Sequence, residues 1–383
     1  MVVEYRPVII GGSAIGNFLA YKLTQKGLKP IVIEEDDQIG QPIQCTGLVS
    51  DKINKFEKLP KDITKNKLSS ARIHFPDGNN LKINGNEILI NRESFDKFWY
   101  EKAREGGADY LLGERLIKFV TADIVYAKTT KRKFKTDMLI GCDGPMSFVR
   151  RHFGIFYKTV PAVQAISKMD VEDDKQANLY FGSKYTNYPF AWSVPEGGDI
   201  SRVGVFVKDD INNRFGDFME HIGAQPIERQ AGIVPIDKPK QSAFQNTILV
   251  GDAACQTKAS TGGGLVTGMV CAEIAADAIA KAYEKLDFSE EFLLREYDHQ
   301  WKKKIIKDLI ISLKMRKLIN KFDDEDLNGL YEFGSQHREL IEKHGDMDFY
   351  SRVYSELKRS SEFRYFIVKK MMKHSALLFD YFF

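Results

Sequence analysis

The chain has 383 residues, of which 43% are hydrophobic and 28% are charged, and these are ordinary proportions for a water-soluble globular protein. This length exceeds one ordinary domain and predicts two or three modules that share a large core. A net charge of only +3 argues against a protein that binds nucleic acid.

The cysteines and the hydropathy narrow the class of protein further. Cys45, Cys142, Cys255 and Cys271 lie far apart without a CxxC pair, so we expect neither disulfides nor a metal site. No stretch reaches the roughly 18 apolar residues that span a bilayer. The first predicted strand begins near residue 8 and leaves no room for a signal peptide, so we expect a cytoplasmic protein.

The C-terminal stretch 301–383 carries a mild positive excess, with 17 Lys and Arg residues against 13 Asp and Glu residues. Solvated helix faces explain this excess. Contact with an anionic membrane surface or with an acidic redox partner is the alternative explanation.

The N-terminal segment follows the order strand, glycine-rich turn, helix, strand, acid. An apolar run at 8–10 leads into Gly11-Gly12-Ser13-Ala14-Ile15-Gly16 and a helical pattern, and a second apolar run at 31–33 ends at Glu34. Glycines in such a turn let the backbone approach a pyrophosphate at the helix N-terminus, although Ser13 replaces a usual glycine. The acid stands where ribose hydroxyls bind. We predict dinucleotide binding, with a turn that holds no ligand as the alternative. The candidate residues are Gly11, Ser13, Ala14, Gly16, Glu34 and Glu35.

The rest of the chain alternates between α/β and β-rich character. We predict a hairpin over 71–91, a helix over 94–106 and a strand over 138–140. Residues 160–245 are rich in β-branched and aromatic residues, which predicts an antiparallel sheet. A strand at 248–250 and a helix at 267–283 restore the α/β pattern, and the chain reads as helical after 289.

Two later motifs resemble those of the aromatic-hydroxylase-like flavoproteins. Residues 142–147, Cys-Asp-Gly-Pro-Met-Ser, resemble the family's Asp-Gly motif, and residues 251–254, Gly-Asp-Ala-Ala, resemble its Gly-Asp motif. The resemblance implies FAD as the cofactor, with Asp252 on the ribityl chain and the glycines at 262–264 near the pyrophosphate and the flavin ring. Arg92 matches the family's Arg-x-x-Phe-Asp segment near the cofactor, or it only caps or pairs on a helix. The implied cofactor set includes Arg92, Asp143, Gly144, Gly251, Asp252, Gly262, Gly263, Gly264 and Leu265.

The segment 40–50 indicates which family of these flavoproteins the chain resembles. Its Cys45-Thr46-Gly47-Leu48-Val49-Ser50 is similar to the Cys-x-Gly-x-x-Ser segment of the geranylgeranyl reductase family, especially its archaeal lipid-reducing members. The resemblance covers residues 7–283 well and the helical tail more loosely. It implies an oxidoreductase that acts on CH–CH groups. Such an enzyme saturates isolated C=C bonds of isoprenoid chains in archaeal-type ether membrane lipids by hydride transfer from reduced FAD.

The same resemblance predicts the domain organisation. We expect an α/β protein, α+β overall, with a discontinuous Rossmann-like FAD-binding domain at 1–160 and 246–288. An antiparallel-sheet substrate domain at 161–245, which the hairpin at 71–91 extends, and a C-terminal helical region at 289–383 complete the chain.

The resemblance also assigns the reacting groups. It places Cys45, Thr46 and Gly47 at the flavin, so the Cys45 thiol is the candidate catalytic group that contacts the double bond or helps to deliver a proton. A small packing residue in a close loop is the alternative role for Cys45.

The family's strand signature Pro-x-x-Tyr-x-Trp-x-Phe-Pro is degraded at 187–195, where only Trp192 and Pro195 are retained. Ala259 likewise stands where many relatives carry proline beside the flavin. The aromatic character still suits an apolar tunnel, with sheet core as the alternative role, and the chain reads as a divergent member. The predicted lining residues are Phe181, Phe190, Trp192 and Phe206.

Several alternatives stay open at this point. The same scaffold supports an FAD-dependent monooxygenase, a reductase of the prenyl tail of a quinone, or a non-enzymatic electron carrier. The chain has no second βαβ fingerprint, so the electron donor, NAD(P)H or a ferredoxin, is undetermined. An isoprenoid lipid substrate makes peripheral membrane contact reasonable.

Overall fold

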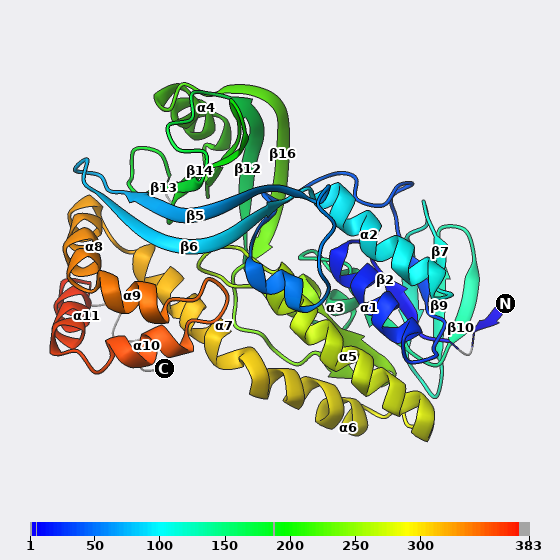
Figure 1. The fold of residues 1–383 in the computed structure, drawn as a ribbon. Helices are drawn as coiled ribbons and strands as arrows, with labels where there is room; N and C mark the ends of the chain where they lie inside the picture. The colour runs from blue at the N-terminus through cyan, green and yellow to red at the C-terminus, as the bar shows by residue number, and fades with distance from the viewer. Residues whose placement is uncertain (1, 5, 187, 375–383) are drawn as a thin grey trace.

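The computed structural model describes residues 2–4, 6–186 and 188–374. Asn187, in the degraded strand signature, and the last nine residues of the predicted helical region lie outside the described residues. Helices and three β-sheets confirm the predicted α/β class (Figure 1). Within the described residues, no helix has the length and apolar character needed to cross a bilayer.

A six-stranded sheet forms the centre of the nucleotide-binding half. Its strands pair in parallel except for the edge strand β17, and each central strand is fully buried, as expected for a sheet covered on both faces. The helices α1 (Ala14–Thr24), α2 (Arg92–Glu105) and α5 (Leu265–Lys285) pack beside one another on this sheet. The strand order is β17 (Ala243–Phe244), β18 (Thr247–Leu249), β11 (Leu139–Gly141), β2 (Val8–Ile10), β3 (Ile31–Ile33) and β7 (Asp109–Leu111).

Smaller elements complete this half. A four-stranded sheet lies at its outer end, and short helices follow the strands that lead into the predicted motifs. The outer sheet comprises β1 (Val2–Glu4), β10 (Lys133–Thr136), β9 (Val125–Thr129) and β8 (Leu116–Val120). The short helices are η1 (Asp51–Lys55), α3 (Phe148–His152) and η2 (Gly251–Ala254).

An eight-stranded sheet forms the second half, and its strands pair antiparallel except where β13 meets β5. The hairpin of β5 and β6 is longer than the predicted 71–91 and joins this sheet together with β4. An unpredicted helix, α4 (Ile211–His221), interrupts the β-rich segment because Phe215, Phe218 and Met219 form an apolar stripe that packs on the sheet. The strand order is β16 (Gln225–Pro235), β12 (Thr159–Lys168), β15 (Ile200–Phe206), β14 (Ala191–Gly197), β13 (Gln176–Tyr180), β5 (Thr64–His74), β6 (Asn80–Ile90) and β4 (Leu48–Ser50).

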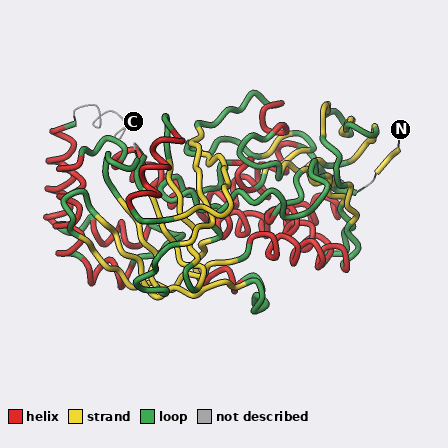
Figure 2. The backbone as a smooth tube through the Cα atoms, turned by 90° about the horizontal axis from the view of Figure 1, so that it is seen from above, coloured by secondary structure: helices red, strands yellow, loops and turns green. Residues whose placement is uncertain are grey.

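The C-terminal region is helical, as predicted, and it lies against the eight-stranded sheet. Helices α8 and α9 contact β6, and α7 contacts α5, so this region bridges the two halves (Figure 1). Seen from above, the terminal helices lie at one end of the molecule, beside the long strands (Figure 2). The helices are α6 (Glu290–Leu293), α7 (His299–Ile319), α8 (Asp324–Gln336), α9 (Arg338–His344), α10 (Ser351–Leu357) and α11 (Ser361–Lys373).

Candidate cofactor and substrate site

The glycine turn between β2 and α1 forms a tight backbone cradle. Gly11 has φ +103°, a conformation that L side chains rarely adopt. A Cβ on Gly16 would lie closer than 3.0 Å to the Gly11 carbonyl oxygen, so α1 packs directly over the turn. Ser13, at the N-cap of α1, is exposed and its side chain makes no capping hydrogen bond. The helix N-terminus is therefore available to an anion such as a pyrophosphate.

This packing predicts the effect of the Gly16→Ala substitution. The new methyl group meets a backbone oxygen that cannot rotate away, so α1 must shift and the cradle opens. We expect FAD affinity to fall about ten- to hundredfold, which corresponds to roughly 1.4–2.7 kcal/mol. Equilibrium dialysis of the protein against FAD measures this loss. Gly216→Ala in α4, where a Cβ meets nothing within 4 Å, is the matched control, and equal FAD affinity in both variants would contradict the prediction.

The predicted acid Glu34 lies beside the turn. Its Oε2 accepts a hydrogen bond from the backbone N–H of Gly12 at 2.6 Å, and its Oε1 accepts one from Asp36 at 3.0 Å. Burial raises the pKa of Glu34 above its ordinary value, although these two N–H groups oppose that shift. The neighbouring Glu35 is exposed. The acid is thus held at the edge of the cradle, where the prediction placed a ribose.

Arg92 and Asp96 at the start of α2 form a buried ion pair behind the same turn. Arg92 Nη2 lies 3.1 and 3.2 Å from the two carboxylate oxygens of Asp96. Asn17 Nδ2, which sequence analysis missed, donates to the carbonyl oxygens of Gly12 at 2.6 Å and Asp96 at 3.1 Å. Burial alone would lower the pKa of Arg92, but Asp96 and the Cys45 side chain raise it above its usual value. Arg92 therefore stays charged between the cradle and Cys45.

The Asp143 carboxylate points into the protein. Its Oδ1 accepts from the Ser147 hydroxyl at 2.5 Å, and its Oδ2 accepts from the backbone N–H of Val149 at 3.0 Å. Both oxygens thus accept hydrogen bonds from the first residues of α3. Burial raises the pKa of Asp143. The next residue, Gly144, has φ +70° and open space around its Cα. A ligand could therefore approach the backbone at this glycine without meeting a side chain.

The Gly-Asp motif and the third glycine loop lie together at the start of α5. Asp252 Oδ1 accepts a hydrogen bond from the Thr257 hydroxyl, and Gly264 packs against both side chains. Burial raises the pKa of Asp252, while Thr257, Arg92 and Arg150 oppose the shift. Gly251 and Gly262 have φ +70° and +74°, and Leu265 begins α5. A second helix N-terminus therefore lies beside Asp252, which interacts electrostatically with Arg92.

The loop that carries Cys45 is fixed to the eight-stranded sheet. The Thr46 hydroxyl donates to Gln164 Oε1 at 2.7 Å, and Arg202 donates to the Thr46 carbonyl oxygen. Gly47, with φ +77°, donates its N–H to Cys45 Sγ at 3.3 Å. Cys45 is half-buried, so its thiol lies at the junction of the cradle and the sheet.

The four predicted lining residues gather in one aromatic cluster on the sheet. Ring centroids lie 6.1 Å apart for Phe181 and Phe190, 5.4 Å for Phe190 and Phe206, and 5.1 Å for Trp192 and Phe206. Phe206 also contacts the glycine loop, since its Cζ lies 3.0 Å from where a Cβ of Gly262 would stand. The aromatic cluster therefore begins next to that loop.

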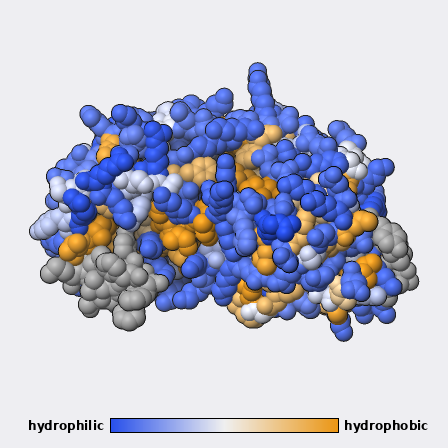
Figure 3. Space-filling model, turned by 90° about the horizontal axis from the view of Figure 1, so that it is seen from below, coloured by the Kyte–Doolittle hydropathy of each residue, from blue (hydrophilic) through white to orange (hydrophobic). Residues whose placement is uncertain are grey.

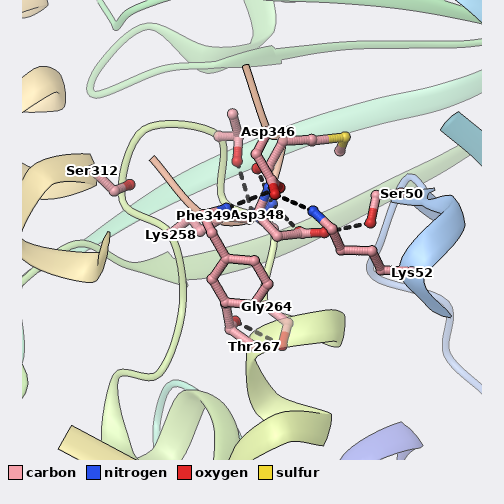
Figure 4. Close-up of polar contacts among 12 residues, drawn as sticks. Ser50, Lys52, Lys258, Gly264, Thr267, Ser312, Asp346, Asp348 and Phe349 are labelled. Atoms are coloured by element: carbon pink, nitrogen blue, oxygen red, sulfur yellow. Dashed lines mark hydrogen bonds and ion pairs between the residues drawn. The ribbon is translucent and has the colours of Figure 1, made fainter. Parts of the chain in front are cut away.

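A buried polar cluster, which sequence analysis missed, joins this glycine loop to the C-terminal region. Lys258 Nζ lies 2.7 Å from both Asp348 Oδ1 and the Met347 carbonyl oxygen. The Ser50 hydroxyl donates to the other carboxylate oxygen of Asp348, and Lys52 pairs with Asp346 (Figure 4). Burial alone would raise the pKa of Asp346, but Lys52 and nearby backbone N–H groups lower it. Three distant segments thus meet beside the predicted flavin loop.

Arg316 on α7 is another residue that sequence analysis missed. Its Nη1 donates to the Ala259 carbonyl oxygen at 3.0 Å, and its guanidinium lies over the rings of Tyr188 at 4.1 Å and Phe206 at 5.0 Å. Burial lowers the pKa of Arg316 to about 9, against the opposing effect of Tyr188. The helical spacing from Leu309 and Leu313 puts position 316 on the apolar face, and a cation there is the signal that could have found it.

Taken together, the cradle of Gly11 and Gly16, the exposed N-terminus of α1 and the second N-terminus at Leu265 fit a dinucleotide that carries a pyrophosphate. Phe206, which lies next to Gly262, connects the glycine loop to the aromatic cluster on the sheet.

Comparisons with known proteins find relatives over most of the chain. The chain is 32% identical over 353 residues to "Digeranylgeranylglycerophospholipid reductase 2" of Methanothermobacter thermautotrophicus, and the match covers 86% of this chain and 91% of the relative. No protein-family model matches the chain.

Solved structures share the fold. A geranylgeranyl bacteriochlorophyll reductase-like protein from Thermoplasma acidophilum superposes with a TM-score of 0.81 at 22% identity, over 97% of this chain and 96% of that one. The halogenase PltM in complex with FAD superposes with a TM-score of 0.65 at 12% identity, over 89% and 84% of the two chains. The fold is therefore that of the FAD-dependent flavoproteins.

Proposed function

The chain belongs to the digeranylgeranylglycerophospholipid reductase family, and on this premise we propose that it saturates the C=C bonds of geranylgeranyl chains in ether phospholipids with electrons from FAD. The observation that carries the proposal is the junction itself. The glycine loop at 262–264 has a neighbour on each side, since a Cβ on Gly264 would meet Asp252 Oδ1 and a Cβ on Gly262 would meet Phe206 of the aromatic cluster.

In this proposal the motif residues of the nucleotide-binding half hold FAD. The N-termini of α1 and α5 face the pyrophosphate, Glu34 binds a ribose, and Arg92 and Asp252 lie near the ribityl chain and the flavin. When bound and reduced, FAD supplies a hydride to one carbon of the double bond. The chain's own task is to position the alkene and to supply the proton for the other carbon.

Cys45 Sγ is the group that we propose as the proton donor. One hydrogen-bond donor points at the sulfur, the Gly47 N–H at 3.3 Å, and the Arg92 guanidinium interacts with the same side chain. The proton moves from Sγ to the alkene carbon, and solvent then restores the thiol. The S–H bond breaks as the new C–H bond forms, so hydride and proton together complete the addition of one H₂.

An anaerobic turnover experiment tests the function. The protein is loaded with FAD, reduced with dithionite and mixed with a digeranylgeranylglycerol phospholipid, while the flavin spectrum and the product mass are followed. We expect reoxidation of the flavin together with a mass gain of about two per reduced bond. A reduced flavin that ignores prenyl lipids and prenyl quinones, but reacts with oxygen to give an oxygenated product, would instead identify a monooxygenase.

Peripheral membrane contact completes the proposal. The face seen in Figure 3 is hydrophilic over most of its area, and its hydrophobic residues gather in separate patches. Tyr365 and Val368 on α11 are 69% and 53% exposed, in a region with a net positive charge. Exposed apolar side chains next to cations suit the surface of an anionic bilayer, from which a prenyl lipid would enter.

A further inference from the structure

Arg316 is a buried cation that forms no ion pair with a carboxylate among the described residues. Its exposed fraction is 1%. Lys258, within the loop at 257–264 that Arg316 contacts, is also buried, but Asp348 neutralises it at 2.7 Å. A buried charge is costly unless it is paired, so the missing partner of Arg316 requires an explanation.

The unused donors of Arg316 are a matched pair. Nη1 is occupied by the Ala259 carbonyl oxygen at 3.0 Å, whereas Nε and Nη2 have no hydrogen-bond partner in the described part of the chain. The N–H bonds of Nε and Nη2 point to the same side of the guanidinium. This edge is the one that binds a carboxylate or a phosphate through two parallel hydrogen bonds. The missing partner is therefore a negatively charged group with two acceptor oxygens, such as a carboxylate or a phosphate.

The surroundings of Arg316 select the kind of anion. Tyr188 and Phe206 cover the guanidinium, and the rings of Phe190 and Trp192 continue from Phe206 at centroid distances of 5.4 and 5.1 Å. A small free anion would gain nothing from this aromatic cluster. A molecule with a phosphate at one end and a long apolar chain would use both features.

We propose that Arg316 binds the phosphate group of the prenyl substrate through Nε and Nη2 and so selects phosphorylated over dephosphorylated substrates. This inference rests on the proposed function and identifies a specificity-determining residue for it. The two nitrogens are shielded from water, so the phosphate reaches them when a covering ring moves aside. Tyr188 is half-buried and Phe206 only 4% exposed, which makes Tyr188 the ring that moves.

The substrate preference of the wild-type protein is the first test. Digeranylgeranylglyceryl phosphate is compared with digeranylgeranylglycerol, and geranylgeranyl diphosphate with geranylgeraniol. We expect kcat/KM to be ten- to hundredfold higher with phosphate, mainly through KM. A preference within both pairs assigns the site to phosphate in general, and one within the lipid pair alone assigns it to the lipid headgroup. Equal rates with and without phosphate would overturn the inference but not the proposed function, whereas no reduction of any substrate would overturn both.

Variants of Arg316 are the second test. Arg316→Met keeps an unbranched side chain without charge, and Arg316→Lys keeps the charge without the two-pronged edge. In both variants we expect the KM for phosphorylated substrates to rise ten- to hundredfold, with the values for dephosphorylated substrates changed less than threefold. Lys303→Met, at an exposed cation on the same helix, is the matched control and should leave the preference intact.

Two further readouts separate binding from other roles. Since Arg316→Met removes an unpaired buried charge, we expect its thermal midpoint to equal or exceed that of the wild type. An equal loss on both substrate classes would assign Arg316 to the fold. A fall in the midpoint potential of the bound flavin with unchanged preference would assign the guanidinium to the flavin instead. If Arg316→Met does not fold, Arg316→Lys and the wild-type preference decide the outcome.

Discussion

Replacement of Cys45 by alanine is expected to reduce the rate of alkene reduction about a hundredfold or more, the usual contribution of a positioned general acid. The substitution removes the S–H group that lies beside the Gly47 N–H and Arg92. The glycine turn at 11–16 and Glu34 are unchanged in this variant. We therefore expect kcat to fall while KM and the FAD content stay within threefold. Anaerobic single-turnover mixing, with flavin reoxidation and product mass as readouts, measures this split.

Two matched variants make the Cys45 result specific. Cys45→Ser retains an O–H group at the same place and is expected to recover part of the rate. Cys271→Ala, which removes a fully buried thiol in the middle of α5, should leave the rate unchanged. Full turnover by Cys45→Ala would show that Cys45 only packs in a close loop.

The parts of the fold that the sequence predicts correctly are those whose signal lies within a short stretch of residues. The strand at Val8–Ile10, the turn and the helix α1 follow one another within a few residues, so periodicity and glycines locate them. The helix α4 also has a local signal, the spacing of Phe215, Phe218 and Met219, but it was hidden by the β-rich composition of its neighbourhood. Composition averaged over a segment is a weaker guide than the spacing within it.

The candidate site was predicted where a motif fixes the backbone, and less well where side-chain direction matters. The glycines do what their residue type requires, since Gly11 and Gly262 have φ values of +103° and +74°. The motif around Asp143 does not reveal that its carboxylate turns inward to Ser147 and Val149. That orientation depends on the start of α3, which the motif's spacing alone does not specify.

Contacts between distant segments cannot be predicted from local sequence patterns. Lys258 and Asp348 are 90 residues apart, and each alone reads as an ordinary surface charge. In the sequence Arg316 also looks like an ordinary surface charge, because the Ala259 carbonyl oxygen that it contacts lies 57 residues earlier. Only the packing of α7 and of the loop at 345–350 against the glycine loop brings these groups together and removes them from water.

That buried ion pair carries the largest stability effect that we expect in this molecule. Lys258→Met leaves the Asp348 carboxylate buried without a counter-ion, since both side chains are 3% exposed. Burial and Asp348 already raise the pKa of Glu87 nearby, and Lys258 is the cation that opposes this shift. Loss of one partner of such a pair costs about 3–5 kcal/mol, so the midpoint of thermal unfolding should fall by several degrees.

A double variant separates the ion pair from simple loss of packing. Lys258→Met combined with Asp348→Asn removes both charges and keeps an acceptor for the Ser50 hydroxyl, so we expect most of the lost stability to return. Lys52→Met breaks the neighbouring pair with Asp346, whose side chains are 24% and 23% exposed, and should cost less than about 1 kcal/mol. Scanning calorimetry of the four proteins in the same buffer measures these differences. If the double variant unfolds as early as Lys258→Met, the methylene stem of Lys258 rather than its charge stabilises the loop at 345–350, and the C-terminal region is joined to the glycine loop by packing alone.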